Sequence, residues 1–435
     1  MTHSQSAHFT RSDEGYFGRG RWPLCEICGR LLLTFFEEDQ MFRRVWLVLF
    51  ASVCLTGSRL DAADEPQLNP PQAGLNVEKL AQIDGLVATA ISEKKLPGCV
   101  VLIGQSEGIA WLKAFGDKRL AAEQESMTDD TVFDLASLTK PLATATSVMK
   151  LVERGKLSLN DQVSKQIPEF GVEGKEAITI RDLLIHRSGL IPDNALADYA
   201  DGPFKAKERL FALKLSAPIG SKFMYSDVNF LVLGEVVTRV SGLPLNEFAQ
   251  REIFAPLGMT ETTYLPAAPL RQRAAPTEKR DGRWMQGEVH DPRAYKLGGV
   301  AGHAGLFGTA RDLARYATDA LAGINHAESR LLKQETWRAM TTRHTIEGPD
   351  RQGQPTKDVR GLGWDMQSRY SINRGTKFST SAFGHGGFTG TAIWIDPENK
   401  LYVIFLSNRV HPDGKGLVNP LIGKIGEIAV EATGN

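Results

Sequence analysis

Residues 133–140 read Phe133-Asp134-Leu135-Ala136-Ser137-Leu138-Thr139-Lys140 and place a serine three positions before a lysine. At the start of a helix this spacing brings both side chains to one face, so the amine can reach the hydroxyl. A serine hydroxyl is a poor nucleophile until a neighbour takes its proton, and a lysine whose pKa is lowered by burial can help. Taken alone, the tetrapeptide is better explained as an N-cap serine followed by a solvated lysine.

Two later segments carry side chains that suit the same chemistry. Tyr225-Ser226-Asp227 comes just before an apolar helix, and a tyrosine beside a lysine can act as general base and acid. Residues 384–390, Gly-His-Gly-Gly-Phe-Thr-Gly, come directly before a predicted strand. Small residues there let a substrate lie along the strand edge, and a free backbone N–H can bind an oxyanion. Each segment also has a plain structural explanation, a half-buried aromatic before a helix cap and a glycine turn with a surface histidine.

In this order, the three segments resemble the active-site motifs of the serine β-lactamase-related family, especially class C β-lactamases, family VIII-type carboxylesterases and D-amino-acid peptidases. Further segments are similar to other signatures of that family: residues 179–190, 253–259, 302–307, 391–397 and 406–409. The resemblance covers residues 75–432. It implies an α+β fold, in which an antiparallel β-sheet is flanked by helices and joined by a mainly helical second lobe.

The resemblance also implies catalytic roles. Ser137 would be the nucleophile that forms an acyl-enzyme, Lys140 its proton partner and Tyr225 the general base. The backbone N–H groups of Ser137 and Phe388 would form the oxyanion hole, beside Gly387. The family's chemistry needs no cofactor, so none is expected.

Two residues depart from the family pattern. Asp227 stands where the second motif usually has asparagine, and its charge is expected to disfavour anionic substrates. His385 stands where the third motif usually has lysine, which weakens the expected hold on a substrate carboxylate. Both changes favour esters or peptides over β-lactams as substrates.

The sequence pattern predicts mixed helices and strands across the body of the chain. Helices are predicted at residues 77–95, 138–153, 230–240 and 422–432, and strands at 98–104, 109–115, 391–395 and 401–407. Strands at both ends with a helical middle agree with an antiparallel sheet and a helical lobe. Asp182 is expected to support a helix, and His186 and His303 to hold turns.

The N-terminal part has a different character. Two arginines follow Met41, then an uncharged run over residues 45–58 and small residues around Ala62, which is typical of a secretory signal at residues 41–63. The apolar run is shorter than the ~20 residues that span a bilayer, so no stable membrane span is predicted. Met41 is then favoured as the start, with residues 1–40 an upstream extension; a long n-region is the alternative. Residues 64–74 are predicted to be a linker, and residues 75–432 the hydrolase domain of a periplasmic or secreted protein.

Composition excludes several other classes of protein. Lys+Arg 51 and Asp+Glu 51 balance, whereas a general nucleic-acid binder carries a basic excess. Four cysteines in 435 residues exclude a disulfide scaffold, and the Cys25 and Cys28 pair lacks further ligands for zinc. Asp291 and its neighbour His290 have no third ligand at a useful spacing, so no metal site is predicted.

The sequence therefore predicts a secreted serine hydrolase that cleaves a small ester, amide or peptide. One alternative is a D-Ala-D-Ala carboxypeptidase or β-lactamase acting on cell-wall peptides or β-lactams. Another is a non-catalytic penicillin-binding sensor, against which the intact set of Ser137, Lys140 and Tyr225 argues.

Overall fold

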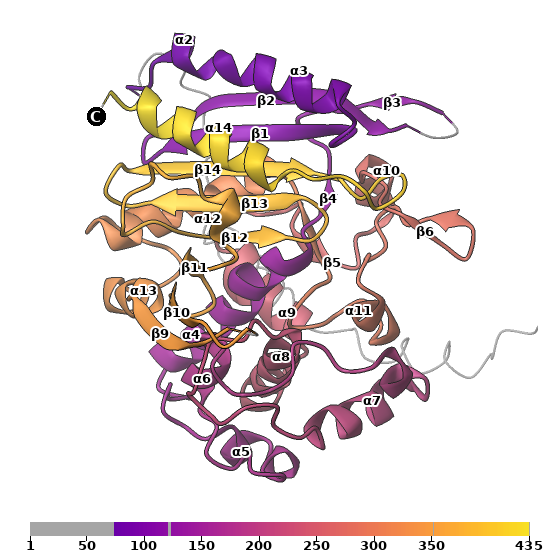
Figure 1. Ribbon diagram of the computed structural model, residues 1–435, viewed down its shortest axis with the longest axis vertical. Coiled ribbons are helices and arrows are strands. Elements are labelled where there is room, and N and C mark those ends of the chain that lie inside the picture. Colours follow the sequence, from indigo (N-terminus) through magenta and orange to yellow (C-terminus); the bar gives the residue numbers. More distant parts are fainter. Residues whose placement is uncertain (1–73, 121–122, 351, 435) are drawn as a thin grey trace, which may run out of the picture. The chain divides into compact units, whose positions relative to one another are not determined.

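An antiparallel sheet organises residues 74–120, 123–350 and 352–434, the part of the chain that the computed structural model describes (Figure 1). Its nine strands lie in the order β3-β2-β1-β14-β13-β12-β11-β10-β9. Their bounds are β1 Gly98–Gln105, β2 Gly108–Arg119, β3 Glu125–Ser126, β9 His344–Pro349, β10 Pro355–Arg360, β11 Asp365–Gln367, β12 Phe383–Gly387, β13 Thr391–Asp396 and β14 Leu401–Ser407. The predicted extension and signal, and the linker up to residue 73, lie outside the described residues.

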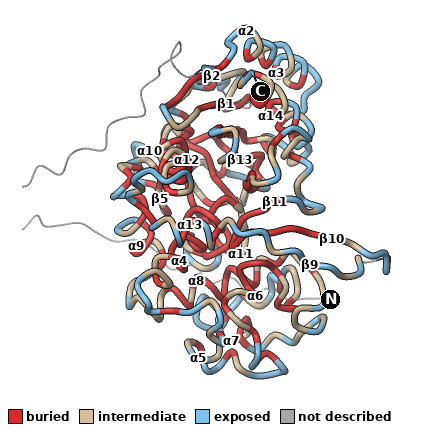
Figure 2. Tube along the Cα trace, turned by 90° about the vertical axis from the view of Figure 1, so that its left-hand side faces the viewer, coloured by how far each residue is buried: buried red, intermediate tan, exposed pale blue. Residues whose placement is uncertain are grey.

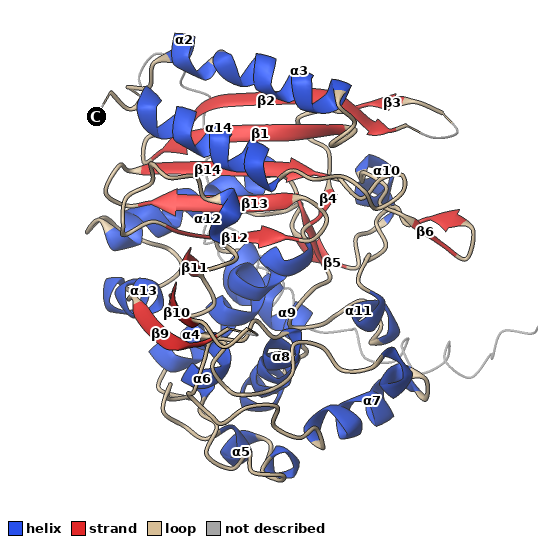
Figure 3. Cartoon of the chain, in the orientation of Figure 1, coloured by secondary structure: helices blue, strands red, loops and turns tan. Residues whose placement is uncertain are grey.

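The central strands β1 and β14 are buried on both faces, which explains their unbroken apolar sequences. Successive side chains of a strand point to opposite faces. Accordingly, Val101 and Ile103 enter one apolar core, while Val100 and Leu102 enter the other. Helices α3 (Gln82–Ser92) and α14 (Asn419–Ala432) cover the first face, and the short α2 (Val77–Leu80) precedes α3 in the chain. Helix α12 (Ala310–Ile324) covers the second face (Figure 3).

A mainly helical lobe is built from the middle of the chain. Its longest helix, α8, begins after Ser226, whose side chain accepts a hydrogen bond from the Asn229 N–H, and ends at Gly242 with φ 75°. Both are favoured helix caps, since glycine adopts positive φ without steric cost. The lobe comprises α4 Thr146–Glu153, α5 Val163–Gln166, α6 Ile180–Leu184, α7 Gly202–Phe211, α8 Asp227–Ser241 and α9 Leu245–Ala249.

Short elements connect the sheet and the lobe. They are β4 Phe133–Asp134, β5 Thr263–Tyr264, α10 Ala268–Arg273, β6 Lys279–Arg280, β7 Arg283–Trp284, α11 Pro292–Lys296, β8 Leu306–Gly308 and α13 Gln334–Thr341. Strands β4, β8 and β5 form a second small sheet, which leads the chain into Ser137. Figure 2 shows buried residues concentrated in the strands of the large sheet and exposed ones on outer helices such as α3.

The predicted α+β class and the eight predicted elements are confirmed, with corrections to two of the helices. The helix predicted at 77–95 is two helices that meet at Ala81. The helix predicted at 138–153 begins with a 3₁₀ turn and one wide π turn over Lys140–Ala145 before α4. The glycine-rich segment precedes β13, as predicted, and its residues Gly384 to Gly387 also pair with β13 as part of β12, where His385 is buried and not at the surface.

Cys99 is fully buried in β1, as its apolar neighbours indicate, and burial raises the pKa of its thiol. Within the described ranges, no single helix combines the length and apolar character of a membrane span. One bent pair, α8 with Leu245–Phe254, passes that test together.

Candidate active site

Ser137 lies in a tight 3₁₀ turn that directly follows β4. The turn requires a positive φ of 45° at Ala136, a conformation that costs a non-glycine residue roughly 1–2 kcal/mol. Buried Asp134 stabilises it, since one carboxylate oxygen accepts the Ala136 N–H at 2.9 Å and the other the His290 N–H at 2.7 Å. Burial raises the pKa of Asp134, and these N–H donors oppose that rise. A strained backbone thus turns the serine into the site.

Lys140 holds the centre of the site, and its side chain is completely buried. Its Nζ donates to Ser137 Oγ at 2.9 Å and to the backbone oxygen of His303 at 3.1 Å. It lies 2.7 Å from Asp227 Oδ1. Lys140 therefore donates two hydrogen bonds and forms one ion pair within the protein.

The charge of Lys140 follows from two opposing effects. Burial lowers its pKa, but the negative charge of Asp227, with a further contribution from Tyr225, raises it more, and the pKa ends above its ordinary value. Burial alone would lower the pKa of Lys140, so the expectation of a lowered pKa from the sequence is wrong. In the resting site Lys140 is an ammonium that donates to Ser137.

Tyr225 completes the set at the N-terminus of α8, as the resemblance implies. Its ring lies between His186, 4.6 Å away, and Tyr370, 5.0 Å away, measured between ring centroids. Burial raises its pKa, and the Asp227 charge adds to this. The Lys140 charge and hydrogen bonds with Ser137 and Lys140 lower it. The phenol is therefore protonated at rest and sits against the nucleophile.

His186 and Asp182 stabilise the structure around Tyr225 and Ser226. The buried His186 has φ 58° and accepts the Ser226 N–H on Nδ1 at 3.1 Å. Burial holds its pKa well below the ordinary value, so it is neutral and able to accept. Asp182 forms a capping box with Thr179 at the start of α6. Their predicted structural roles are confirmed.

His303 acts through its backbone, a role the sequence did not reveal. Gly302 precedes it, and a Cβ there would lie 1.9 Å from the Phe230 carbonyl oxygen of α8, so only glycine fits. The Gly302 oxygen accepts the Thr144 hydroxyl at 2.7 Å. This packing aims the next carbonyl, that of His303, at Lys140.

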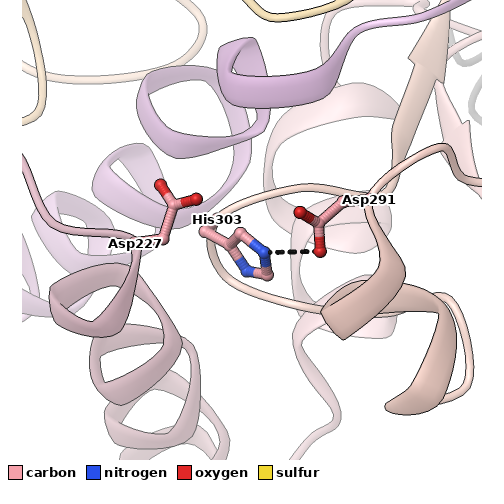
Figure 4. A group of neighbouring side chains, drawn as sticks. All are labelled: Asp227, Asp291 and His303. Atoms are coloured by element: carbon pink, nitrogen blue, oxygen red, sulfur yellow. Dashed lines mark hydrogen bonds and ion pairs between the residues drawn. The ribbon is translucent and has the colours of Figure 1, made fainter. Parts of the chain in front are cut away.

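Asp227, Asp291 and His303 form a cluster beside the lysine (Figure 4). Their ligand atoms lie within 4.8 Å of one another, and His303 Nε2 is 2.9 Å from Asp291 Oδ1. Burial opposes ionisation of Asp291, but the charge and hydrogen bond of His303 hold the pKa of its carboxyl far below the ordinary value. The sequence analysis paired Asp291 with His290, which is not part of this cluster, and it missed both partners found here because they are brought to Asp291 by the fold. Since the Lys140 ammonium already contacts Asp227, these residues fit an ion-pair cluster better than a metal site.

The turn after β12 is tied to the nucleophile segment. The Thr389 hydroxyl donates to the Asp134 carbonyl at 2.7 Å, and the Thr391 hydroxyl to the Leu135 carbonyl at 3.1 Å. A Cβ at Gly387 would lie 2.7 Å from the Leu135 oxygen, so this close approach requires glycine. Phe388 lies on the turn held in this way, with its ring largely exposed. The oxyanion hole formed by Ser137 and Phe388 N–H groups stays a prediction.

His385 occupies the lysine position without the lysine's charge. It is buried, with Nδ1 2.8 Å from the Gly386 carbonyl oxygen and its ring 5.9 Å from that of Tyr225. Burial first, then the charges of Arg360 and Lys140, hold its pKa well below the ordinary value. A neutral imidazole cannot supply the cation that would hold a substrate carboxylate.

Asp227→Asn is expected to move the pH profile of kcat/KM on a neutral ester toward lower pH. The carboxylate raises the pKa values of Lys140 and Tyr225, so both should fall without it. The acidic limb, where the base must lose its proton, and the alkaline limb, where the ammonium is needed, then shift in the same direction.

The matched control is Asp413→Asn, which removes an exposed carboxylate paired with Lys415. An unshifted profile in Asp227→Asn would show that its charge does not act on the two groups. Because Lys140 neutralises Asp227, we expect the substitution to change the preference between anionic and neutral substrates only slightly.

The sequence is similar to those of known proteins along most of its length. The family model described as Beta-lactamase matches residues 83–426. A protein of Escherichia coli (strain K12) with the provisional name D-alanyl-D-alanine carboxypeptidase is 32% identical over 428 residues, covering 89% of this chain and 96% of its own. A protein of the same provisional name from Salmonella enteritidis PT4 is 32% identical over 414 residues, covering 86% and 93%.

Two solved structures have the same fold. A penicillin-binding protein homologue from Caulobacter crescentus gives a TM-score of 0.65 at 23% identity and covers 82% of this chain and 98% of its own. EstCE1, a hydrolase with promiscuous acyltransferase activity, gives a TM-score of 0.63 at 24% identity, with 81% and 99% covered.

Proposed function

Because this chain belongs to the beta-lactamase family of serine hydrolases, we propose that it hydrolyses small acyl compounds, in particular peptides ending in D-alanine, through an acyl-enzyme on Ser137. The observation that carries the proposal is the 2.9 Å hydrogen bond from Lys140 Nζ to Ser137 Oγ. The D-alanyl class is supported by the name of relatives that match this chain over most of both lengths.

The geometry supports the following sequence of steps. Tyr225 acts from its phenolate form, which is a minor species because its pKa is raised. The phenolate takes the Ser137 proton as Ser137 Oγ attacks the substrate carbonyl carbon, and the Lys140 ammonium stabilises the negative charge on the serine and tyrosine oxygens. The tyrosine then returns the proton to the leaving atom as the carbonyl–leaving-group bond breaks. Water attacks the acyl-enzyme by the same route and restores Ser137.

The proposal is tested by incubating the purified protein with an N-acyl-D-Ala-D-Ala peptide, its L-Ala-L-Ala counterpart, p-nitrophenyl acetate and nitrocefin. We expect release of D-alanine from the first peptide alone and hydrolysis of the ester, each absent in Ser137→Ala. Hydrolysis of the ester without release of D-alanine would leave an esterase and refute the peptide substrate. Acylation of Ser137 without turnover on any compound would indicate a sensor and refute the proposal.

We also propose that the protein is exported, as the arginines and apolar run after Met41 indicate. A chain that begins at Met41, expressed in a bacterial host, is expected to be cut near Ala62 or Ala63. The exported product would keep Cys99 alone, which is buried, so its stability should not respond to reductant. N-terminal sequencing is the measurement, and a secreted product that still carries Cys25 and Cys28 would overturn the proposal.

A further inference from the structure

A cavity of about 290 Å³ opens beside the catalytic tyrosine and has no role in the steps above. Four separate parts of the chain contribute to it: the loop before α7, the segment that leads into α8, the turn between β9 and β10, and the loop after β11. Its lining residues are Ile191, Pro192, Ser216, Lys222, Phe223, Met224, Tyr225, Pro349, Asp350, Arg369 and Tyr370.

The position of the leaving group can be inferred from the residue that gives it a proton, because the two must be in contact. Lys140 is completely buried, and its ammonium contacts Ser137, the His303 carbonyl and the Asp227 carboxylate. Tyr225 is only partly buried and borders the cavity. The proton therefore reaches the leaving atom from Tyr225, so the leaving group lies next to this side chain. Tyr225 is one of the residues that line the cavity.

An aromatic wall lines this cavity. The ring of Tyr370 lies 5.0 Å from that of Tyr225 and 5.9 Å from that of Phe223, and the Tyr370 side chain is 51% exposed. Phe223 is buried beneath it. A half-exposed ring held by two others offers a fixed apolar face to a flat or aliphatic group.

Three charged side chains line the cavity, and they differ in what they contact. The Arg369 guanidinium is paired with buried Asp358 at 2.8 Å and also donates to Thr356. Asp350 uses one carboxylate oxygen to accept two backbone N–H groups of its own turn. Lys222 makes no side-chain hydrogen bond or ion pair with any residue in the described ranges. The unpaired cation beside Tyr225 is therefore Lys222.

We propose that this cavity is the leaving-group subsite and that Lys222 binds a carboxylate on the leaving group, while Tyr370 supports its apolar part. The inference rests on the proposed function and narrows it to acyl compounds with an anionic leaving group, such as the terminal residue of a peptide. Neutral His385 cannot bind a substrate carboxylate as a cation, and in this proposal Lys222 supplies that positive charge from the cavity wall.

The test uses two esters of the same N-acyl-D-alanine, a 3-carboxyphenyl ester and a phenyl ester. Both leaving groups are aromatic, and they differ by one carboxylate. We expect the wild-type protein to prefer the carboxylated ester by about 10-fold in kcat/KM, a ratio typical of one charge-assisted contact. Lys222→Gln should bring the ratio close to one, and Lys222→Arg should keep most of it.

Two further variants separate this role from general effects. Lys156→Gln removes an exposed lysine outside the cavity and should leave the ratio unchanged. Tyr370→Ala should slow both esters alike, because both rings lose the same wall, and should keep the ratio. Thermal unfolding of each variant identifies any that is misfolded, and Lys222→Arg then serves as the folded comparison.

The outcomes distinguish this inference from the proposed function. Hydrolysis of both esters at equal rates, or a preference that survives Lys222→Gln, would overturn the subsite and leave the hydrolase proposal intact. A wild-type protein that hydrolyses neither ester would refute the hydrolase proposal itself, and the subsite with it.

Discussion

Ser137→Ala is expected to lower turnover by roughly 10³-fold or more, because no other group in the described site can form the acyl-enzyme. The change removes one hydroxyl whose side-chain partner is Lys140, and that ammonium retains Asp227 and the His303 carbonyl. The fold should therefore persist. Initial rates on p-nitrophenyl acetate measure the effect, and far-UV circular dichroism with thermal unfolding checks the fold.

The matched control for the nucleophile is Ser92→Ala, which changes an exposed serine at the end of α3 that donates to the Thr89 carbonyl. It should retain most of the activity. Mass spectrometry of the wild-type protein treated with a fluorophosphonate should place the adduct on the peptide that holds Ser137. A Ser137→Ala protein that keeps most of its esterase activity would mean that another nucleophile acts.

Lys140→Ala and Tyr225→Phe are each expected to lower kcat by about 10²–10⁴-fold, the range of general acid–base groups. Both contact Ser137, and each changes the pKa of the other. Groups that act as one unit give strongly non-additive losses, so the double variant should be little worse than the poorer single variant. Kinetics of the four proteins on one ester form the cycle.

The two single variants differ in what else they disturb. Tyr225→Phe removes one oxygen and keeps the ring between His186 and Tyr370, so its stability should stay close to wild type. Lys140→Ala leaves Asp227 without its partner, and its free energy of unfolding should fall. Losses that simply multiply in the double variant would show that the two residues work separately, contrary to the mechanism.

Much of this site could be predicted from the order of its three motifs along the chain and from the types of residue in them. The serine and lysine of one turn are three positions apart, so their contact is a local property that spacing predicts. Strands β1 and β14 are apolar except at their last residues, Gln105 and Ser407, and continuous apolar runs of this length are readily identified as strands. The position of Tyr225 just before α8 could also be predicted, because it depends only on residues nearby in the sequence.

What the sequence could not predict depends on contacts between distant segments. The direction of the Lys140 pKa shift is set by Asp227, whose position relative to Lys140 depends on how α8 packs. The role of His303 lies in a backbone carbonyl, which residue type does not report. Strand β12 contains three glycines, which disfavour strands, and it forms because β13 supplies the pairing.

The pairing of β1 with β14 has a consequence for how the chain is made. It joins the first long strand of the domain to the last, and β2 pairs with the outer edge of β1. During synthesis β1 and β2 can form only a hairpin, which is marginally stable alone, until residue 407 has emerged. Pairing across so long a loop is also slow. The nucleophile turn meets the β12–β13 turn only at that late stage, so the catalytic residues come together only after almost the whole chain has been synthesised.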